Sequence, residues 1–150
     1  MVSTYGIHMD SIPMGRTYFD FFMKLDKQLF DSVAKLAAVS PRLRMNYDLR
    51  DSEDENGQRM LNVLLPGTKS AIHRHTDTSE VGVCIYGSAI ERFYDDKGNE
   101  TERVVMTAGC DCPGVVVEQG RYHSLKATNE VGVIFEAEAH RYHHLEQKIF

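Results

Sequence analysis

The feature that most constrains the fold is a change in hydrophobic period at Pro41. After this residue, apolar side chains alternate with polar ones, and short apolar segments recur at regular spacing up to residue 138. Alternation with a period of two is typical of β-strands that bury one face. The expected strands are residues 43–49, 58–65, 71–75, 80–86, 89–94, 100–107, 115–118, 122–126 and 131–138. Many short strands separated by turns predict an all-β sandwich or closed barrel.

Before Pro41 the period is that of a helix. Apolar residues recur at steps of three and four and so share one helical face: Tyr18, Phe22, Leu25, Leu29, Val33 and Leu36. Thr17 is expected to cap the start of this helix, and Pro41 to end it. We therefore expect an N-terminal extension and helix over residues 1–41 and a barrel over residues 42–150. The apolar stripe faces either the core or a dimer partner.

Composition narrows the range of partners. The chain has 150 residues, which suits one domain, and a formal net charge of -5 with basic and acidic residues interspersed. This pattern argues against a nucleic-acid or anionic-membrane surface, and no segment approaches the ~18 apolar residues of a membrane span. The three cysteines include a Cys110-x-Cys112 pair that is too close for a usual disulfide framework. We expect free thiols, a cytoplasmic protein and a small-molecule ligand.

The segment between Gly67 and Gly87 carries candidate metal ligands. His73 and His75 lie two residues apart, so on one strand their imidazoles point the same way. A turn of four residues then returns the chain so that Glu80 can reach the same point. Two imidazoles and a carboxylate suit Fe(II), Mn(II), Zn(II) or Ni(II). A His-x-His pair alone is a weak signal, because strand histidines are often surface residues.

The spacing from Gly67 to Gly87 resembles the first motif of the cupin superfamily, without an insertion or deletion. A later stretch that ends at His123 is similar to the second cupin motif, although Glu118 replaces a usual proline and Cys112 a usual glycine. The resemblance implies a cupin double-stranded β-helix, or jelly-roll barrel, preceded by the α-helix. It also implies one divalent metal ion held by His73, His75, Glu80 and His123.

Within the cupins, the chain resembles the WbuC family of cupin-fold metalloproteins, which are found in bacterial surface-polysaccharide gene clusters. The resemblance runs from Arg42 to near the C-terminus. It rests on Arg44-Met45-Asn46-Tyr47-Asp48, Gln58-Arg59-Met60-Leu61-Asn62, His73-Arg74-His75, Phe93-Tyr94-Asp95 with Gly98, Tyr122-His123, and Glu136 with Tyr142. It implies one metal ion in the barrel and leaves the reaction and the substrate undefined.

Polar strand faces supply candidate ligand contacts. One face is shared by Arg42, Arg44 and Asn46, and another by Gln58 and Asn62. Such faces either bind sugar hydroxyls or a phosphate or are simply solvated. Glu136 lies in the last apolar strand and faces either solvent or a polar cavity. The candidate substrate-binding residues are Arg44, Asn46, Gln58 and Glu136.

Two other features have alternative interpretations. Cys84 faces the same way as Glu80, so its thiol lies near the metal or serves as a small core side chain. The histidine cluster at residues 140–144 is interpreted as a polar surface.

Three functions are compatible with this pattern. The first is a metal-dependent isomerase, lyase or oxygenase acting on a small sugar, polyol or keto acid. The second is a ligand-binding or sensing module without turnover. The third is a metal-independent sugar epimerase or isomerase with histidines as acid and base, which would not need Glu80 at ligand spacing. The apolar surface of residues 18–36 and 131–137 predicts a homodimer.

Overall fold

The structure is a computed structural model that describes residues 11–12, 22–139 and 145–148. The described elements are β1 (Ser11–Ile12), α1 (Lys27–Val39), β2 (Arg44–Asp48), β3 (Gln58–Leu64), β4 (Ile72–His75), β5 (Glu80–Tyr86), β6 (Ser88–Tyr94), β7 (Glu100–Thr107), β8 (Gly114–Val117), β9 (Tyr122–Ala127), β10 (Gly132–Glu138) and β11 (Leu145–Lys148). The expected strands are therefore confirmed, and β5 and β7 have the predicted bounds. The short strands β1 and β11 were not expected.

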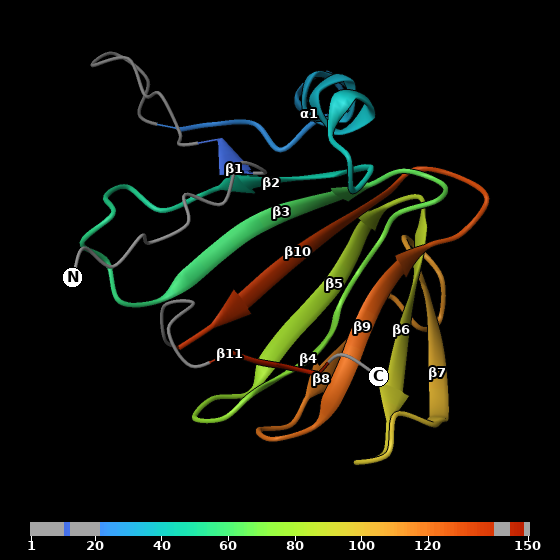
Figure 1. The fold of residues 1–150 in the computed structure, drawn as a ribbon. Helices are drawn as coiled ribbons and strands as arrows, with labels where there is room; N and C mark the ends of the chain where they lie inside the picture. Colours follow the sequence, from blue (N-terminus) through green and yellow to red (C-terminus); the bar gives the residue numbers. More distant parts are fainter. Residues whose placement is uncertain (1–10, 13–21, 140–144, 149–150) are drawn as a thin grey trace.

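The strands form two sheets that face each other (Figure 1). One sheet has the order β1-β2-β3-β10-β5-β8, and the other has the order β11-β4-β9-β6-β7. All the pairs are antiparallel except the one between β1 and β2. Successive strands from β3 to β10 alternate between the sheets, apart from the β6–β7 hairpin, and this is the jelly-roll arrangement. The predicted all-β jelly-roll barrel with an N-terminal helix is confirmed.

The predicted start of the helix is wrong. Residues 22–26 are not helical, and α1 begins at Lys27. Asp26 is the N-cap, because its carboxylate accepts a hydrogen bond from the backbone N–H of Leu29 at 3.1 Å. The apolar pattern continues upstream through Phe22, which is 72% exposed and belongs to no helical face. The proposed cap at Thr17 lies outside the described residues. The helix ends at Val39, two residues before Pro41, as expected.

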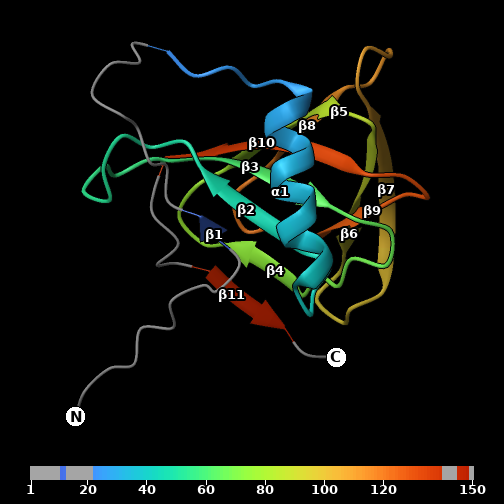
Figure 2. The ribbon, with the colours of Figure 1, turned by 90° about the horizontal axis from the view of Figure 1, so that it is seen from above.

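The helix covers the outer face of the first sheet. Figure 2 shows α1 lying across β2 and β3. Its buried side chains pack on apolar residues of β2, β3 and β10, and together they form an outer core: Phe30, Val33, Ala37, Met45, Leu61, Val63 and Val133. The apolar stripe of the helix therefore faces its own barrel. Of the predicted positions, Val33 is buried and Leu29 packs against the outer core, whereas Phe22, Leu25 and Leu36 are exposed.

The register of the first sheet defines which side chains face the barrel interior. Glu80 on β5 is opposite Glu138 on β10, and Glu138 is opposite Gln58 on β3. Residues in register share a face. Two residues along each strand, Gly82 is opposite Glu136. The alternation places these residues on the inner face, away from α1.

Part of the interior is a closed apolar cluster. An inner apolar cluster contains Leu64, Cys84, Ala89, Met106, Leu125 and Ile134, all buried. Cys84 is a small core residue here, and its thiol donates to the backbone oxygens of Tyr86 and Gly87, each at 3.3 Å. All three cysteines, at positions 84, 110 and 112, are free, as expected. In the part of the chain that the structure describes, no helix is long and apolar enough to cross a membrane.

Candidate metal centre

The structure brings the four predicted metal ligands together inside the barrel. His73 and His75 come from β4, His123 from β9 and Glu80 from the start of β5. One ligand atom from each residue can be chosen so that all four lie within 4.8 Å of one another. His73 and His123 are cross-strand partners, and their ring centroids are 4.2 Å apart. Three imidazoles and a carboxylate thus converge from three strands.

The Nδ1 atom of each imidazole, which points away from the other ligands, lies beside a hydrogen-bond acceptor. The Nδ1 atoms of His73 and His123 lie 3.1 and 3.0 Å from the backbone oxygens of Ala71 and Arg121. The Nδ1 atom of His75 lies 2.9 Å from Glu138 Oε2. A carbonyl oxygen can only accept, so His73 and His123 carry the proton on Nδ1 and leave Nε2 as a lone-pair donor. This arrangement of outer partners is the one that orients metal-binding histidines.

The inner nitrogens fit a metal ion. His75 Nε2 and His123 Nε2 are buried and have no hydrogen-bond partner among the described residues. Glu80 Oε2 lies 2.9 Å from His75 Nε2 without the alignment of a hydrogen bond, and Glu80 Oε1 lies 3.8 Å from His123 Nε2. Buried nitrogens are rarely left unsatisfied. A divalent cation that accepts both lone pairs and neutralises Glu80 satisfies the whole group.

The surroundings give the three histidines different pKa values. Burial lowers the pKa of His73 to about 3, and the neighbouring His123 adds to this effect. Burial likewise lowers the pKa of His123. For His75 burial acts in the same direction, but the carboxylates of Glu138 and Glu80 outweigh it and raise the pKa to about 10. In the metal-free protein His75 therefore holds a proton at neutral pH, whereas the other two rings are neutral.

Two glycines shape turns next to strands that carry metal-ligand candidates: Gly87 follows β5, and Gly120 precedes β9. Gly87 has φ 63°, and a Cβ at this position would overlap the carbonyl oxygen of Val131. Gly120 has φ 79°, and its N–H donates to the backbone oxygen of His75 at 2.7 Å. The unusual Glu118 does not disturb this turn, because its carbonyl still accepts from the N–H of Arg121 at 3.2 Å.

The four candidate substrate-binding residues lie on the inner face of the first sheet. Arg44, Asn46 and Gln58 are buried, and Glu136 is partly buried. Arg44 Nη1 donates to Ser70 Oγ at 2.9 Å, and Asn62 Nδ2 donates to Glu136 Oε1 at 2.9 Å. The question left open for Glu136 is thus answered in favour of the interior. Burial, together with the charge of Glu80, raises the pKa of Glu136 to about 7.

Sequence reasoning missed two carboxylates. Glu138 orients His75, and the available signal was its position two residues after Glu136 on the same strand. Glu91 on β6 is only 3% exposed and alternates with the buried Ala89 and Phe93. Burial and the charges of Glu80 and Glu136 raise the pKa of Glu91 well above its usual range. A carboxylate between two apolar residues of one strand face was the signal for Glu91.

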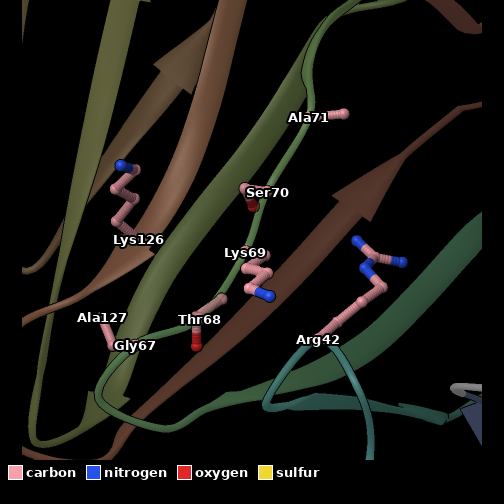
Figure 3. A pocket seen from close by; sticks show the side chains of 8 residues that line it. All are labelled: Arg42, Gly67, Thr68, Lys69, Ser70, Ala71, Lys126 and Ala127. Carbon is pink, nitrogen blue, oxygen red and sulfur yellow. The ribbon is translucent and has the colours of Figure 1, made fainter.

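A separate pocket of about 690 Å³ lies beside the segment that precedes β4 (Figure 3). Its lining includes the cationic side chains of Arg42, Lys69 and Lys126 and the hydroxyls of Thr68 and Ser70. Ser70 also accepts the hydrogen bond from Arg44, so one residue contacts both this pocket and the inner face. The histidine cluster at residues 140–144 and Tyr142 lie outside the described residues.

Several solved structures with a similar fold are named as oxalate oxidase or oxalate decarboxylase. Oxalate oxidase in complex with the substrate analogue glycolate superposes with a TM-score of 0.56 at 16% identity over 72% of this chain and 56% of that chain. A variant of Bacillus subtilis oxalate decarboxylase gives a TM-score of 0.52 at 22% identity over 69% of this chain and 27% of that chain. A second structure of that decarboxylase, whose description names Mn(II) centres, gives 0.52 at 18% identity, with the same coverage.

These likenesses establish the cupin fold. The chain spans 27% to 56% of the length of these three neighbours. No curated protein matches the sequence. One protein family does match: its description is "Domain of unknown function (DUF6016)", and the match covers residues 25–106. This match includes α1, β2 to β6 and three of the four metal-ligand candidates. Because it extends over more than half of the 150 residues, the chain belongs to the DUF6016 family.

Proposed function

We propose that the protein is a metal-dependent cupin enzyme that acts on a small sugar, polyol or keto acid. The observation that carries this proposal is the convergence of His73, His75, Glu80 and His123, with two buried imidazole nitrogens unsatisfied. Fe, Mn, Zn and Ni are the candidate ions. The Mn(II) centres named for the oxalate decarboxylase neighbour support the inclusion of Mn. A bound ion would act as a Lewis acid or an oxygen-activating centre.

The protein's own residues would bind and orient the substrate. Arg44, Asn46, Gln58 and Glu136 are the proposed contacts, because they share the inner face with Glu80 through the strand register. The cation of Arg44 suits a carboxylate or phosphate, and the amides suit hydroxyl groups. Glu138 would keep His75 in a fixed ring orientation through the 2.9 Å contact. Burial of this set keeps bulk water away from the reacting group.

The resemblance to the WbuC family supports a role in surface-polysaccharide metabolism as part of the same proposal. Its motifs include Arg44, Asn46 and Gln58, which lie inside the barrel. A cytoplasmic setting also belongs to the proposal, and three unpaired cysteines are consistent with it. A homodimer is proposed as the oligomeric state.

Metal analysis followed by a ligand screen tests the proposed function. Protein made without a chelating tag should contain about one transition-metal ion per chain. Metal-loaded protein should then be screened for turnover of sugars, nucleotide sugars and hydroxy or keto acids, with the metal-free form as control. Metal content well below one ion after loading would overturn the proposal. Metal-dependent ligand binding without turnover would instead favour the ligand-binding or sensing module.

A further inference from the structure

Five buried side-chain atoms from the two sheets, in residues that face the barrel interior, have no hydrogen-bond partner among the described residues. They are Arg44 Nε, Asn46 Oδ1, Gln58 Oε1, Asn62 Oδ1 and Glu91 Oε1. The five residues are all at least nine-tenths buried. Unsatisfied buried polar atoms are rare and costly, so a group of them indicates a missing partner. We call these five residues the inner polar cluster.

The inner polar cluster is contiguous with the candidate metal centre. Asn46 is opposite Asn62 across β2 and β3, and Asn62 donates to Glu136, whose register partner Gly82 lies two residues after Glu80. Gln58 is opposite Glu138, the residue that orients His75. Glu91 reaches this group from the second sheet and interacts electrostatically with Arg44 and Glu80. A ligand held by the cluster would therefore lie beside the metal ligands.

The unsatisfied atoms of the inner polar cluster are mostly hydrogen-bond acceptors. Four of them are oxygens, and one is a guanidinium nitrogen. The orientation of Asn62 is fixed because its Nδ2 donates to Glu136, so its free atom is an acceptor. The orientation of Arg44 is fixed by its bond to Ser70. The complement of this set is a molecule with several hydroxyl donors and a single anionic group.

We propose that the inner polar cluster binds a polyhydroxylated acid, with the carboxylate against Arg44 and hydroxyls donating to the four oxygens. This inference deepens the proposed function by narrowing its substrate class. A keto acid without hydroxyls leaves the four oxygens unsatisfied. A neutral polyol can accept from Arg44 Nε through a hydroxyl oxygen, but it carries no anion to pair with the guanidinium charge. A molecule that carries both groups satisfies all five atoms.

Matched ligands test this assignment by calorimetry on the full chain, in metal-free and metal-loaded forms. Aldonic acids from threonate to gluconate are each compared with the alditol and the unsubstituted fatty acid of equal length. At least one aldonic acid should bind about tenfold or more tightly than both of its counterparts, since the fatty acid lacks the hydroxyl donors and the alditol lacks the charge-assisted pair with Arg44. Equal binding of the fatty acid would overturn the role of the oxygens, and equal binding of the alditol would overturn the role of Arg44.

Variants separate the two halves of the site. Arg44→Gln should abolish the preference for the acid over the alditol, and Asn62→Leu should weaken both hydroxylated ligands but not the fatty acid. Arg92→Gln is the control, because Arg92 is the neighbour of Glu91 on β6 and points to the opposite face. If Arg44→Gln does not fold, Arg44→Lys keeps the charge but removes Nε, and it should reduce the preference.

Two outcomes distinguish this inference from the proposed function. If no ligand of the series binds to folded, metal-loaded protein, water alone fills the inner polar cluster and the inference is overturned, while the metal centre stands. If an aldonic acid binds with the expected selectivity but the protein holds no metal, the inference stands and the proposed metal-dependent function fails.

Discussion

The two faces of the sheet that contains β2, β3 and β10 have opposite chemistry. The outer face is apolar and is sealed by α1, with Leu61 and Val63 fully buried. The inner face carries Arg44, Asn46 and Asn62. A sheet that covers a core normally places its apolar face inward. Here the inner face of the same strands is largely polar. The outer face, packed under α1, stabilises the fold, and the inner face of this sheet carries residues proposed to bind metal and substrate.

The sharpest test of this division is the loss of a metal ligand. His75→Ala should reduce the metal content from about one ion per chain to less than about a tenth, because an imidazole at the centre is removed. The fold should persist, since the outer core is untouched. Elemental analysis and circular dichroism measure the two effects. Thr76→Ala is a control at an exposed neighbour. Unchanged metal content in His75→Ala would contradict the ligand assignment.

The opposite perturbation is made in the outer core. Leu61→Ala should lower the free energy of unfolding by about 2–4 kcal/mol, because a fully buried side chain leaves a cavity. Urea denaturation measures this change. The folded fraction should still bind metal with the stoichiometry of the unaltered protein. Val105→Ala is the matched control, since Val105 is 52% exposed and should change stability by less than about 0.5 kcal/mol. Loss of metal from folded Leu61→Ala would show that the two faces are coupled.

Metal binding in the polar interior should depend on pH mainly through the protonation of His75. From the sequence alone, the three histidines are assigned the same ordinary pKa of ~6.5. This predicts that the metal is released below about pH 6 and that more than one histidine takes up a proton. In the structure only His75 has a raised pKa, to about 10, whereas the pKa values of His73 and His123 are lowered. The pKa of Glu80 is also lowered, because the adjacent imidazole of His75 and the neighbouring His123 outweigh the effect of burial.

Metal binding at neutral pH should therefore release about one proton, from His75. Since metal and proton compete for that ring, the apparent affinity should rise about tenfold per pH unit between about pH 6 and pH 9. Calorimetry in two buffers with different ionisation enthalpies counts the protons. Release of two or more protons at neutral pH would support the equal-histidine interpretation, and release of none would show that His75 is already neutral.

The smallest expected effect concerns the homodimer. The apolar strand at residues 131–137 cannot supply its interface, because β10 lies between β3 and β5 with Val133 and Ile134 buried. Exposed apolar residues remain at Val81 and Val116, which are register partners on β5 and β8. Light scattering at micromolar concentration should give the mass of two chains, and Val116→Lys should weaken that dimer. A monomer mass for the unaltered protein would refute the prediction.

Local sequence determined most of the secondary structure and three of the four metal-ligand candidates, whereas His123 was identified from the resemblance to the second cupin motif. Alternation predicted the strands because it reports the face of a half-buried strand directly. The spacing of His73, His75 and Glu80 was informative because positions two apart on a strand point the same way. The helix start was not predictable from periodicity, because the apolar pattern runs on through Phe22, whereas the hydrogen bond from Leu29 to Asp26 fixes the first turn.

The tertiary structure decided the direction and the partners of the polar residues. The sequence pattern of β2 and β3 shows one apolar and one polar face, and only the packing of α1 on the apolar face turns Asn46 and Asn62 inward. The contacts of Glu138 with His75 and of Glu136 with Asn62 join positions more than sixty residues apart. Such pairs depend on which strands become neighbours. Strand order is set by the packing of the whole barrel, so the hydrophobic periodicity of a single segment does not predict it.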